Sequence, residues 1–301
     1  MPDSGLPRSD ARADFARERR RRAVASIASR LRFEPDDVSV MLPFDEVIAA
    51  LGRAGQVDLG VQVIPLDSIV GTVDRRAGEF DRAFRPASTD TRSRWERIAA
   101  ARRRGEPMPP IDVYRIGDLH FVQDGHHRVS VARALGDTDI NAHVTEIRTK
   151  LGADRALQLR DLPLKRHERV FFERVPLPPA ARARIQLSDE WRWAQLGNMV
   201  EGWGYRASLH RGHLLSRPEM AAAWFRDEYE PVVEALREAG FGGPGTETER
   251  YLRIAMLRFL LLQTHDWSDE IAERLADQVK SPSAGAEKDT MTHQIIKELR
   301  D

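Results

Sequence analysis

The stretch that decides the fold is residues 111–128, IDVYRIGDLHFVQDGHHR, which the run VSVARALG follows directly. Two runs rich in β-branched and aromatic residues, 111–116 and 119–122, flank Gly117-Asp118, a dipeptide typical of a β-hairpin turn. VSVARALG has the helical spacing of apolar residues and ends at a glycine. The stretch therefore predicts a hairpin whose second strand leads directly into a helix.

The segments on either side extend this mixed pattern. Residues 61–66, VQVIPL, have the β-branched content of a strand, and residues 91–105 have the apolar spacing of a helix. Residues 139–147, DINAHVTEI, read as a further strand. Because strands and helices alternate within 57–150, we predict a compact α+β domain there.

The rest of the chain is predicted to be helical at both ends of this domain. A capping box, Thr246 with Glu249, marks the start of one of the later helices. The predicted parts are a disordered 1–10, N-terminal helices in 11–56, the α+β domain in 57–150, a helical domain in 151–280, and a flexible tail with a short terminal helix in 281–301.

Composition excludes several classes of protein. The 301 residues include 47 basic and 47 acidic side chains and no cysteine. Disulfides, thiolate zinc sites and thiol catalysis are therefore excluded. No run approaches about 18 consecutive apolar residues, and the N-terminus lacks the apolar core of a signal peptide. We expect a cytoplasmic protein with no membrane partner.

The junction between strand and helix has the features of an anion-binding site. The first turn of the helix contains His126, His127 and Arg128, next to unpaired backbone N–H groups and the positive end of the helix dipole. Gly125 allows the backbone to approach a ligand closely. A phosphate is the anion that such a position most naturally binds.

Two other roles stay open for this junction. Asp124 could bind Mg²⁺, accept a proton from a substrate, or only cap the helix. Asp124, His126 and His127 are also three potential ligands of a transition metal. Adjacent histidines on a helix point about 100° apart, and no HExxH pair is present, which makes that metal site the weaker interpretation.

The order of elements in 57–150 resembles the ParB/sulfiredoxin-like superfamily. The similarity rests on VIPLDSIVGTVDR, FDRAFRP and the run from RWERIAAARRRGEPMPPIDVYRI through GDLHFVQDGHHRVSVARALG. ParB proteins carry G-E-R-R and sulfiredoxins G-C-H-R where this chain has Gly125-His126-His127-Arg128. The D-G-H-T-R form of the free serine kinases of this fold is the most similar motif. The resemblance implies a bacterial ParB-like protein.

This resemblance implies a nucleotide site. Gly125, His127 and Arg128 match its phosphate-binding positions, and His126 lies between them. Arg82 and Arg85 fall where ParB proteins have a loop that faces nucleotide and DNA. The implied ligand is CTP, ATP or ADP with Mg²⁺, and the implied role is a regulatory switch.

The resemblance also leaves an enzyme open. A phosphotransferase or nucleotide hydrolase would use Asp124 as general base or Mg²⁺ ligand and His127 to steady the transferring phosphate. A third hypothesis is DNA binding through the run Arg17–Arg22, part of a segment, 11–32, with six net positive charges. A solvated helix face is the alternative for that run. The helical domain would contact a partner or form a homodimer.

Overall fold

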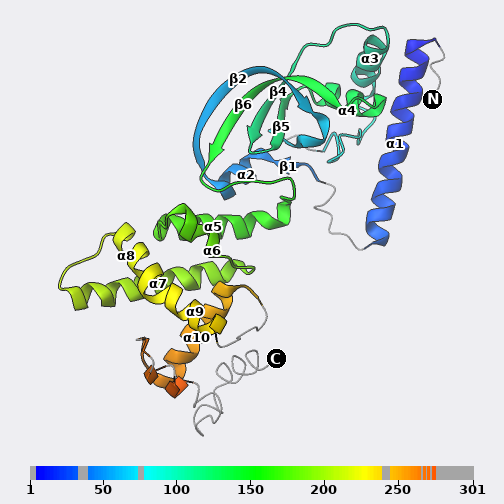
Figure 1. Ribbon diagram of the computed structural model, residues 1–301. Helices are drawn as coiled ribbons and strands as arrows, with labels where there is room; N and C mark the ends of the chain where they lie inside the picture. Colours follow the sequence, from blue (N-terminus) through cyan, green and yellow to red (C-terminus); the bar gives the residue numbers. More distant parts are fainter. Residues whose placement is uncertain are drawn as a thin grey trace. The chain divides into compact units, whose positions relative to one another are not determined.

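The computed structural model describes residues 5–32, 40–73, 78–238, 245–265, 267–268, 270–271 and 273–275. The chain forms two compact units, Met1–Arg166 and His167–Asp301. The first contains a mixed sheet with helices and the second is helical (Figure 1). The predicted α+β class with a helical C-terminal part is thus confirmed. The tail predicted for 281–301 lies outside the described residues.

The first unit is built on a six-stranded sheet with the strand order β1-β3-β5-β4-β6-β2. Strand β5 lies inside the sheet, parallel to β3 and antiparallel to β4, while β6 is parallel to β4 and antiparallel to β2. The strands are β1 Leu42–Pro43, β2 Arg53–Pro65, β3 Ile69–Thr72, β4 Ile111–Ile116, β5 Leu119–Asp124 and β6 Asp139–Thr149.

The predicted hairpin and the helix after it are confirmed. In β4 and β5, Tyr114 pairs with Phe121, and Gly117 takes a positive φ of 56° in the turn. Helix α4, His126–Leu135, follows β5 after one residue and ends at Gly136 in the left-handed conformation. It begins three residues before the apolar run VSVARALG, so the polar residues after Gly125 form its first turn.

Helices cover both faces of the sheet. The central strand β5 has apolar side chains on both faces, and each set is buried under helices. Val122 belongs to the core that α3, Arg92–Arg103, and α4 form around the fully buried Trp95. The next residue back, Phe121, packs on the other side against Phe44 of α2, Phe44–Leu51. Successive side chains of a strand point to opposite faces, so this pattern places a helical layer on each face.

Helix α1, Pro7–Leu31, begins earlier than the sequence predicts. We expected disorder through residue 10, but proline is favoured at the first helical position and Asp10 complements the helix dipole in the first turn. Phe15 of α1 packs edge-on against Trp95 of α3, with 5.5 Å between ring centroids. The N-terminal helices are therefore part of the first unit.

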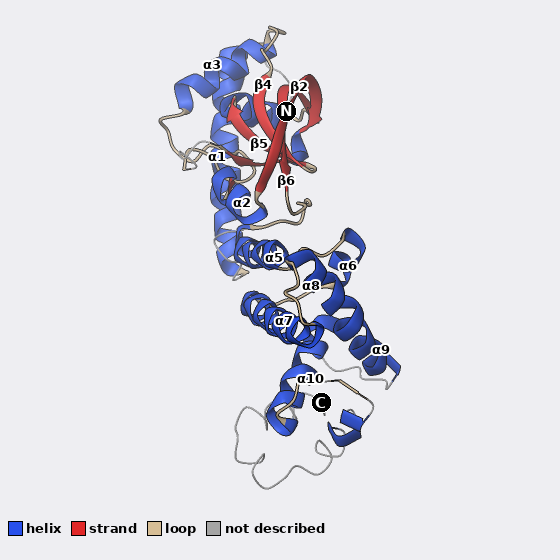
Figure 2. Cartoon of the chain, turned by 90° about the vertical axis from the view of Figure 1, so that its left-hand side faces the viewer, coloured by secondary structure: helices blue, strands red, loops and turns tan. Residues whose placement is uncertain are grey.

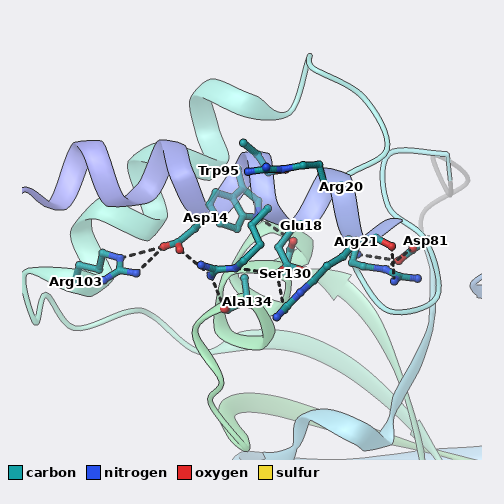
Figure 3. A network of polar contacts seen from close by, with 12 residues as sticks. Asp14, Glu18, Arg20, Arg21, Asp81, Trp95, Arg103, Ser130 and Ala134 are labelled. Atoms are coloured by element: carbon teal, nitrogen blue, oxygen red, sulfur yellow. Dashed lines mark hydrogen bonds and ion pairs between the residues drawn. The ribbon is translucent and has the colours of Figure 1, made fainter. Parts of the chain in front are cut away.

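A buried carboxylate joins α1 to α3 and α4 (Figure 3). Asp14 is 2% exposed, and its Oδ2 accepts hydrogen bonds from Nε and Nη2 of Arg103 at 3.1 and 2.7 Å. Arg17 lies 2.7 Å from the other oxygen and also donates to the carbonyl of Ala134, near the end of α4. The α1 helix is thus held by hydrogen bonds from its buried face.

The described residues of the second unit are mostly helical (Figure 2). The capping box predicted at Thr246 and Glu249 is confirmed, because each side chain accepts a hydrogen bond from the backbone of the other. A π-helical turn, Phe225–Tyr229, joins α8 to α9. The helices are α5 Leu162–Arg174, which begins in the first unit, α6 Pro179–Arg184, α7 Glu190–Arg211, α8 Arg217–Trp224, α9 Glu230–Glu238 and α10 Glu247–Leu262.

Within the described residues, no helix combines the length and the apolar character that crossing a membrane requires.

Candidate functional site

The site begins at Gly125, the residue between β5 and α4. Its φ of +106° lies in the region that L residues rarely adopt. A Cβ built on it would lie 2.4 Å from Cγ2 of Ile111 on β4. Only glycine satisfies both conditions, and the chain therefore turns from strand to helix within one residue.

The N-terminus of α4 has open hydrogen-bond donors. No side chain caps the helix, and the backbone N–H of Val129 makes the first bond of the helix, to the carbonyl of Gly125 at 3.0 Å. The N–H groups of His127 and Arg128 precede that bond, so they point out of the helix end. Together with the helix dipole they form the anion-binding end that the sequence predicts.

His127 is buried at this helix end, with 9% of its surface exposed. Its Nδ1 is buried and has no hydrogen-bond partner among the described residues. The ring packs edge-on against Phe80, with centroids 5.2 Å apart. Burial lowers the pKa of His127 to about 4, and the charges of Arg94 and His126 act in the same direction. The imidazole is neutral at pH 7, with one unused polar atom.

His126 is held by the end of β3 and by the loop before α3. Its Nε2 lies 2.7 Å from Oγ1 of Thr72, and its ring stacks with Phe80 and Phe84. Phe84 is 1% exposed and takes a φ of +59°, a strained conformation for an aromatic residue. The loop therefore holds Phe84 in a strained backbone conformation while Phe84 packs against His126 and Phe80 packs against both histidines.

Arg128 and Asp124 lie together. One Nη of Arg128 donates to the carbonyls of Pro109 and Pro110 at 2.8 and 2.6 Å, and the other donates to Oδ2 of Asp124. The Arg128 side chain is 14% exposed and that of Asp124 is 58% exposed. A guanidinium has five N–H donors, so these contacts leave Nε–H and one Nη2–H for a ligand.

These residues line a hollow of about 140 Å³. Its walls come from residues 123–128, from Glu79 and Phe80 of the loop, and from Arg94 and Ile98 of α3. The exposed Arg94 has no ion-pair partner among the described residues. The hollow has four charged side chains, and their charges sum to zero: Arg94, Arg128, Glu79 and Asp124.

A larger hollow of about 300 Å³ also has Arg128 in its wall. Arg128 and Ile98 line both hollows. The larger one combines apolar groups, such as Val63 and Met108, with polar groups, such as Asn141. The site thus consists of a small polar hollow and a larger mixed one that share a guanidinium.

Arg82 and Arg85 lie outside these hollows. Nη2 of Arg82 donates to the carbonyl of Leu157 at 3.3 Å. Nε of Arg85 donates to Asp81 Oδ2 at 2.8 Å, and its Nη1 donates to the carbonyl of Arg21. The structure does not bring them to the helix end. Arg94, which sequence reasoning missed, is the arginine from outside the motif that lies there.

Part of the arginine run of α1 contacts the rest of the first unit. Four of its five guanidinium groups have partners within the unit, and that of Arg19 has none among the described residues. These partners are Asp14 for Arg17, the Ala16 carbonyl for Arg20, Glu18 for Arg21 and the Ala87 carbonyl for Arg22. The contacts of Arg17 with Ala134 and of Arg22 with Ala87 leave α1 and help to dock it, whereas the other partners lie within the helix itself.

The described residues contain no group of three or more histidine, aspartate or glutamate side chains that could hold a metal ion. His126 bonds to Thr72, and Asp124 to Arg128. The smaller hollow contains two carboxylates that a cation could contact, those of Glu79 and Asp124.

No protein-family model matches the chain, and no curated protein matches it. Among solved structures, the chain is similar to the C2221 form of a Pnob8-like ParB-N domain, at 11% sequence identity. The match covers 82% of this chain and 97% of that one, with a TM-score of 0.22. At this TM-score the similarity carries no argument.

Proposed function

We propose that this protein binds a nucleotide, with phosphate at the N-terminus of α4, and that binding regulates the protein. The unused Nδ1 of His127 is the observation that carries the proposal. A buried polar atom without a partner costs free energy, on the order of 1–3 kcal/mol. His127 lines the small hollow. In the tautomer that carries its proton on Nδ1, a phosphate oxygen there would give this nitrogen an acceptor, and Arg94 would pair with the charge.

Magnesium fits this proposal as part of the ligand. Mg²⁺ in nucleotide sites is held by one or two carboxylates and by the phosphates themselves. Glu79 and Asp124 would supply the carboxylates, and the cation would offset their repulsion of a polyphosphate. This explains why a hollow with balanced charge would take an anion.

The larger hollow supports a nucleoside as the rest of the ligand. A volume of about 300 Å³ is at the lower end of small-molecule sites. Its apolar walls suit a base, and polar groups such as Asn141 suit the edge of a base or a ribose. Arg128, which lines both hollows, would lie between phosphate and nucleoside.

Titration calorimetry with ATP, ADP and CTP, each with and without Mg²⁺, tests the proposal. We expect one of the three to bind, and Arg94→Ala to weaken that binding at least ten-fold. The matched control is Arg97→Ala, because Arg97 is an exposed arginine on the same helix outside the hollow. No binding by the wild type, or equal losses in the two variants, would overturn the proposal.

The alternative is an enzyme that transfers or hydrolyses the terminal phosphate. It is favoured by the place of Asp124, which lines the small hollow and is half exposed. Asp124→Asn keeps the shape of the side chain and removes its basicity. If phosphate release occurs in the wild type and is lost in Asp124→Asn while nucleotide still binds, the protein is an enzyme. Binding without phosphate release supports the regulatory role.

A further inference from the structure

A short hairpin, residues 79–87, lies between β3 and α3. Phe80 and Pro86 form an antiparallel bridge, and the backbone N–H of Ala87 donates to the carbonyl of Glu79 at 2.8 Å. Because backbone contacts join the two sides of the hairpin, a displacement of one side is passed to the other.

One side of this hairpin forms a wall of the proposed phosphate site. Glu79 and Phe80 line the small hollow, and the ring of Phe80 packs against His127. Phe84, near the tip of the hairpin, stacks with His126 at 6.2 Å between ring centroids. The hairpin thus contacts both histidines of the first turn of α4.

The other side of the hairpin holds α1. Nη1 of Arg22, on α1, donates to the carbonyl of Ala87 at 3.3 Å. Nη1 of Arg85, on the hairpin, donates to the carbonyl of Arg21 at 3.3 Å. The hairpin and α1 therefore exchange one hydrogen bond in each direction.

Phe80 lies between the site and a hollow next to α1. Its side chain is buried and lines the small hollow of the site. It also lines a third hollow, of about 380 Å³, whose walls include Arg22 and Ala25 of α1. Protein interiors are usually close-packed, so a space of this kind leaves room for the hairpin to shift between the site and α1.

Backbone strain in the hairpin is the second observation. Phe84 is buried and has a φ of +59°. The guanidinium of Arg133 lies over its ring, 5.0 Å from the centroid, and also donates to the carbonyl of Arg82 at 3.2 Å. Strained residues persist only where their surroundings hold them, and they cluster in ligand clamps and switch regions. The conformation of the hairpin therefore depends on what surrounds it.

We propose that the ligand at the N-terminus of α4 controls how firmly the second half of α1, residues 19–31, docks on this hairpin. This inference rests on the function proposed above. A ligand shifts an equilibrium only if it interacts differently with the two arrangements. Glu79 supplies that difference, because Mg²⁺ bound with the phosphates draws its carboxylate toward Asp124. The hairpin is then fixed against α4, and its hydrogen bonds with Arg21 and Arg22 are kept.

The first half of α1, residues 7–18, is held independently of the hairpin. Asp14 accepts hydrogen bonds from Arg103 of α3, and Phe15 packs against Trp95 of the same helix. The ligand should therefore change the docking of the second half more than that of the first. The two halves of one helix provide an internal comparison.

Amide hydrogen exchange of the full chain, measured by mass spectrometry, is the first experiment. With Mg²⁺ and whichever of ATP, ADP or CTP binds in calorimetry, we expect residues 19–31 to exchange about five-fold more slowly. Residues 7–18 should change less, and Mg²⁺ alone should have no effect. Nucleotide binding without slower exchange in 19–31, or with equal slowing in both halves, would overturn this inference and leave nucleotide binding intact. Absence of nucleotide binding would overturn both.

Calorimetry of α1 variants tests the same coupling from the other end, because coupling between two sites is reciprocal. We expect Arg22→Ala to raise the dissociation constant of the nucleotide about five-fold and to abolish the slower exchange in 19–31. Arg19→Ala is the matched control, because Arg19 belongs to the same run and its guanidinium has no partner among the described residues. Equal affinities of the two variants, or slower exchange that persists in Arg22→Ala, would contradict the inference. Circular dichroism melting confirms that each variant is folded.

Discussion

At the scale of single residues, the turn at Gly125 is limited by backbone conformation and by space at once. Its φ of +106° alone makes other residues unfavourable, and Ile111 occupies the volume where a Cβ would lie. Gly136, at the other end of α4, has a φ of +86° but nothing within 4 Å of a Cβ. A substitution at Gly136 therefore tests backbone strain alone, whereas a substitution at Gly125 tests strain together with steric overlap.

We predict that Gly136→Ala lowers the free energy of unfolding by about 1 kcal/mol, the cost of a left-handed alanine. Gly125→Ala should lower it by about 3 kcal/mol, because the contact with Ile111 adds to the strain. Urea unfolding followed by circular dichroism measures both. Equal losses would show that Ile111 moves aside without cost.

His127 is the second residue whose environment makes a specific prediction. Asparagine places an amide nitrogen near the position of Nδ1, whereas phenylalanine keeps the ring and removes the polar atom. We expect His127→Asn to bind nucleotide within a few-fold of the wild type and His127→Phe to bind at least ten-fold more weakly. Calorimetry with the nucleotide that binds the wild type is the measurement. Equal binding by His127→Phe would show that Nδ1 does not contact the phosphate.

Residues of this site differ in how far the sequence predicts them. The motif residues from Asp124 to Arg128 lie together because they are adjacent in the chain, so the sequence alone was sufficient to predict that they share a site. Arg94 reaches the same hollow from the first turn of α3, and nothing in its sequence context marks which side of that helix faces α4. Arg82 and Arg85 were placed by resemblance alone, and local pairing with Asp81 and with carbonyl groups decides where they lie.

At the scale of elements, helix α1 depends on a buried carboxylate. Asp14 is bonded by Arg103 and Arg17, and removing it would take a carboxylate acceptor from two partly buried guanidinium groups. The arginine run in the sequence indicated a solvated helix face or a DNA contact, and a contact between residues far apart in the chain leaves no local signal. This explains why the strand and helix pattern was predictable and the docking of α1 was not.

We predict that Asp14→Ala lowers the free energy of unfolding by about 2 kcal/mol, less than for a fully buried pair because both arginines are partly exposed. Trypsin should also cleave within α1 faster in this variant, because the undocked helix exposes its arginines. Glu106→Ala, which breaks the exposed pair with Arg104, is the control and should change stability by less than about 0.5 kcal/mol. Similar effects in the two variants would mean that Asp14 does not hold α1.

At the scale of the whole molecule, two buried histidines link stability to pH. Burial lowers the pKa of His120 to about 4, with a further contribution from Arg115, and Ser68 Oγ lies 2.9 Å from its Nδ1. His127 has a pKa of about 4 for the same main reason. In the unfolded chain both would titrate near pH 6.5.

The sign of the effect follows from proton uptake. Below pH 6.5 the unfolded chain binds protons that the native histidines do not, so stability falls as the pH drops from about 6.5 to about 4. We expect a loss on the order of 3 kcal/mol for each histidine at the lower limit, beyond the contribution of the carboxylates. Urea unfolding at a series of pH values measures it. His120→Gln with His127→Asn should flatten the curve between these limits, and an unchanged slope would contradict the assignment.

The contact between Arg17 and Ala134 also has a consequence during translation. These residues are 117 positions apart, and Asp14 and Arg103 are 89 apart. A ribosome adds about 5–20 residues per second, so α1 emerges roughly ten seconds before the helix that completes its binding surface. During that interval α1 lacks first the contacts with α3 and then, for longer, the contact with α4. Factors that bind nascent chains would therefore meet α1 before α4 covers it.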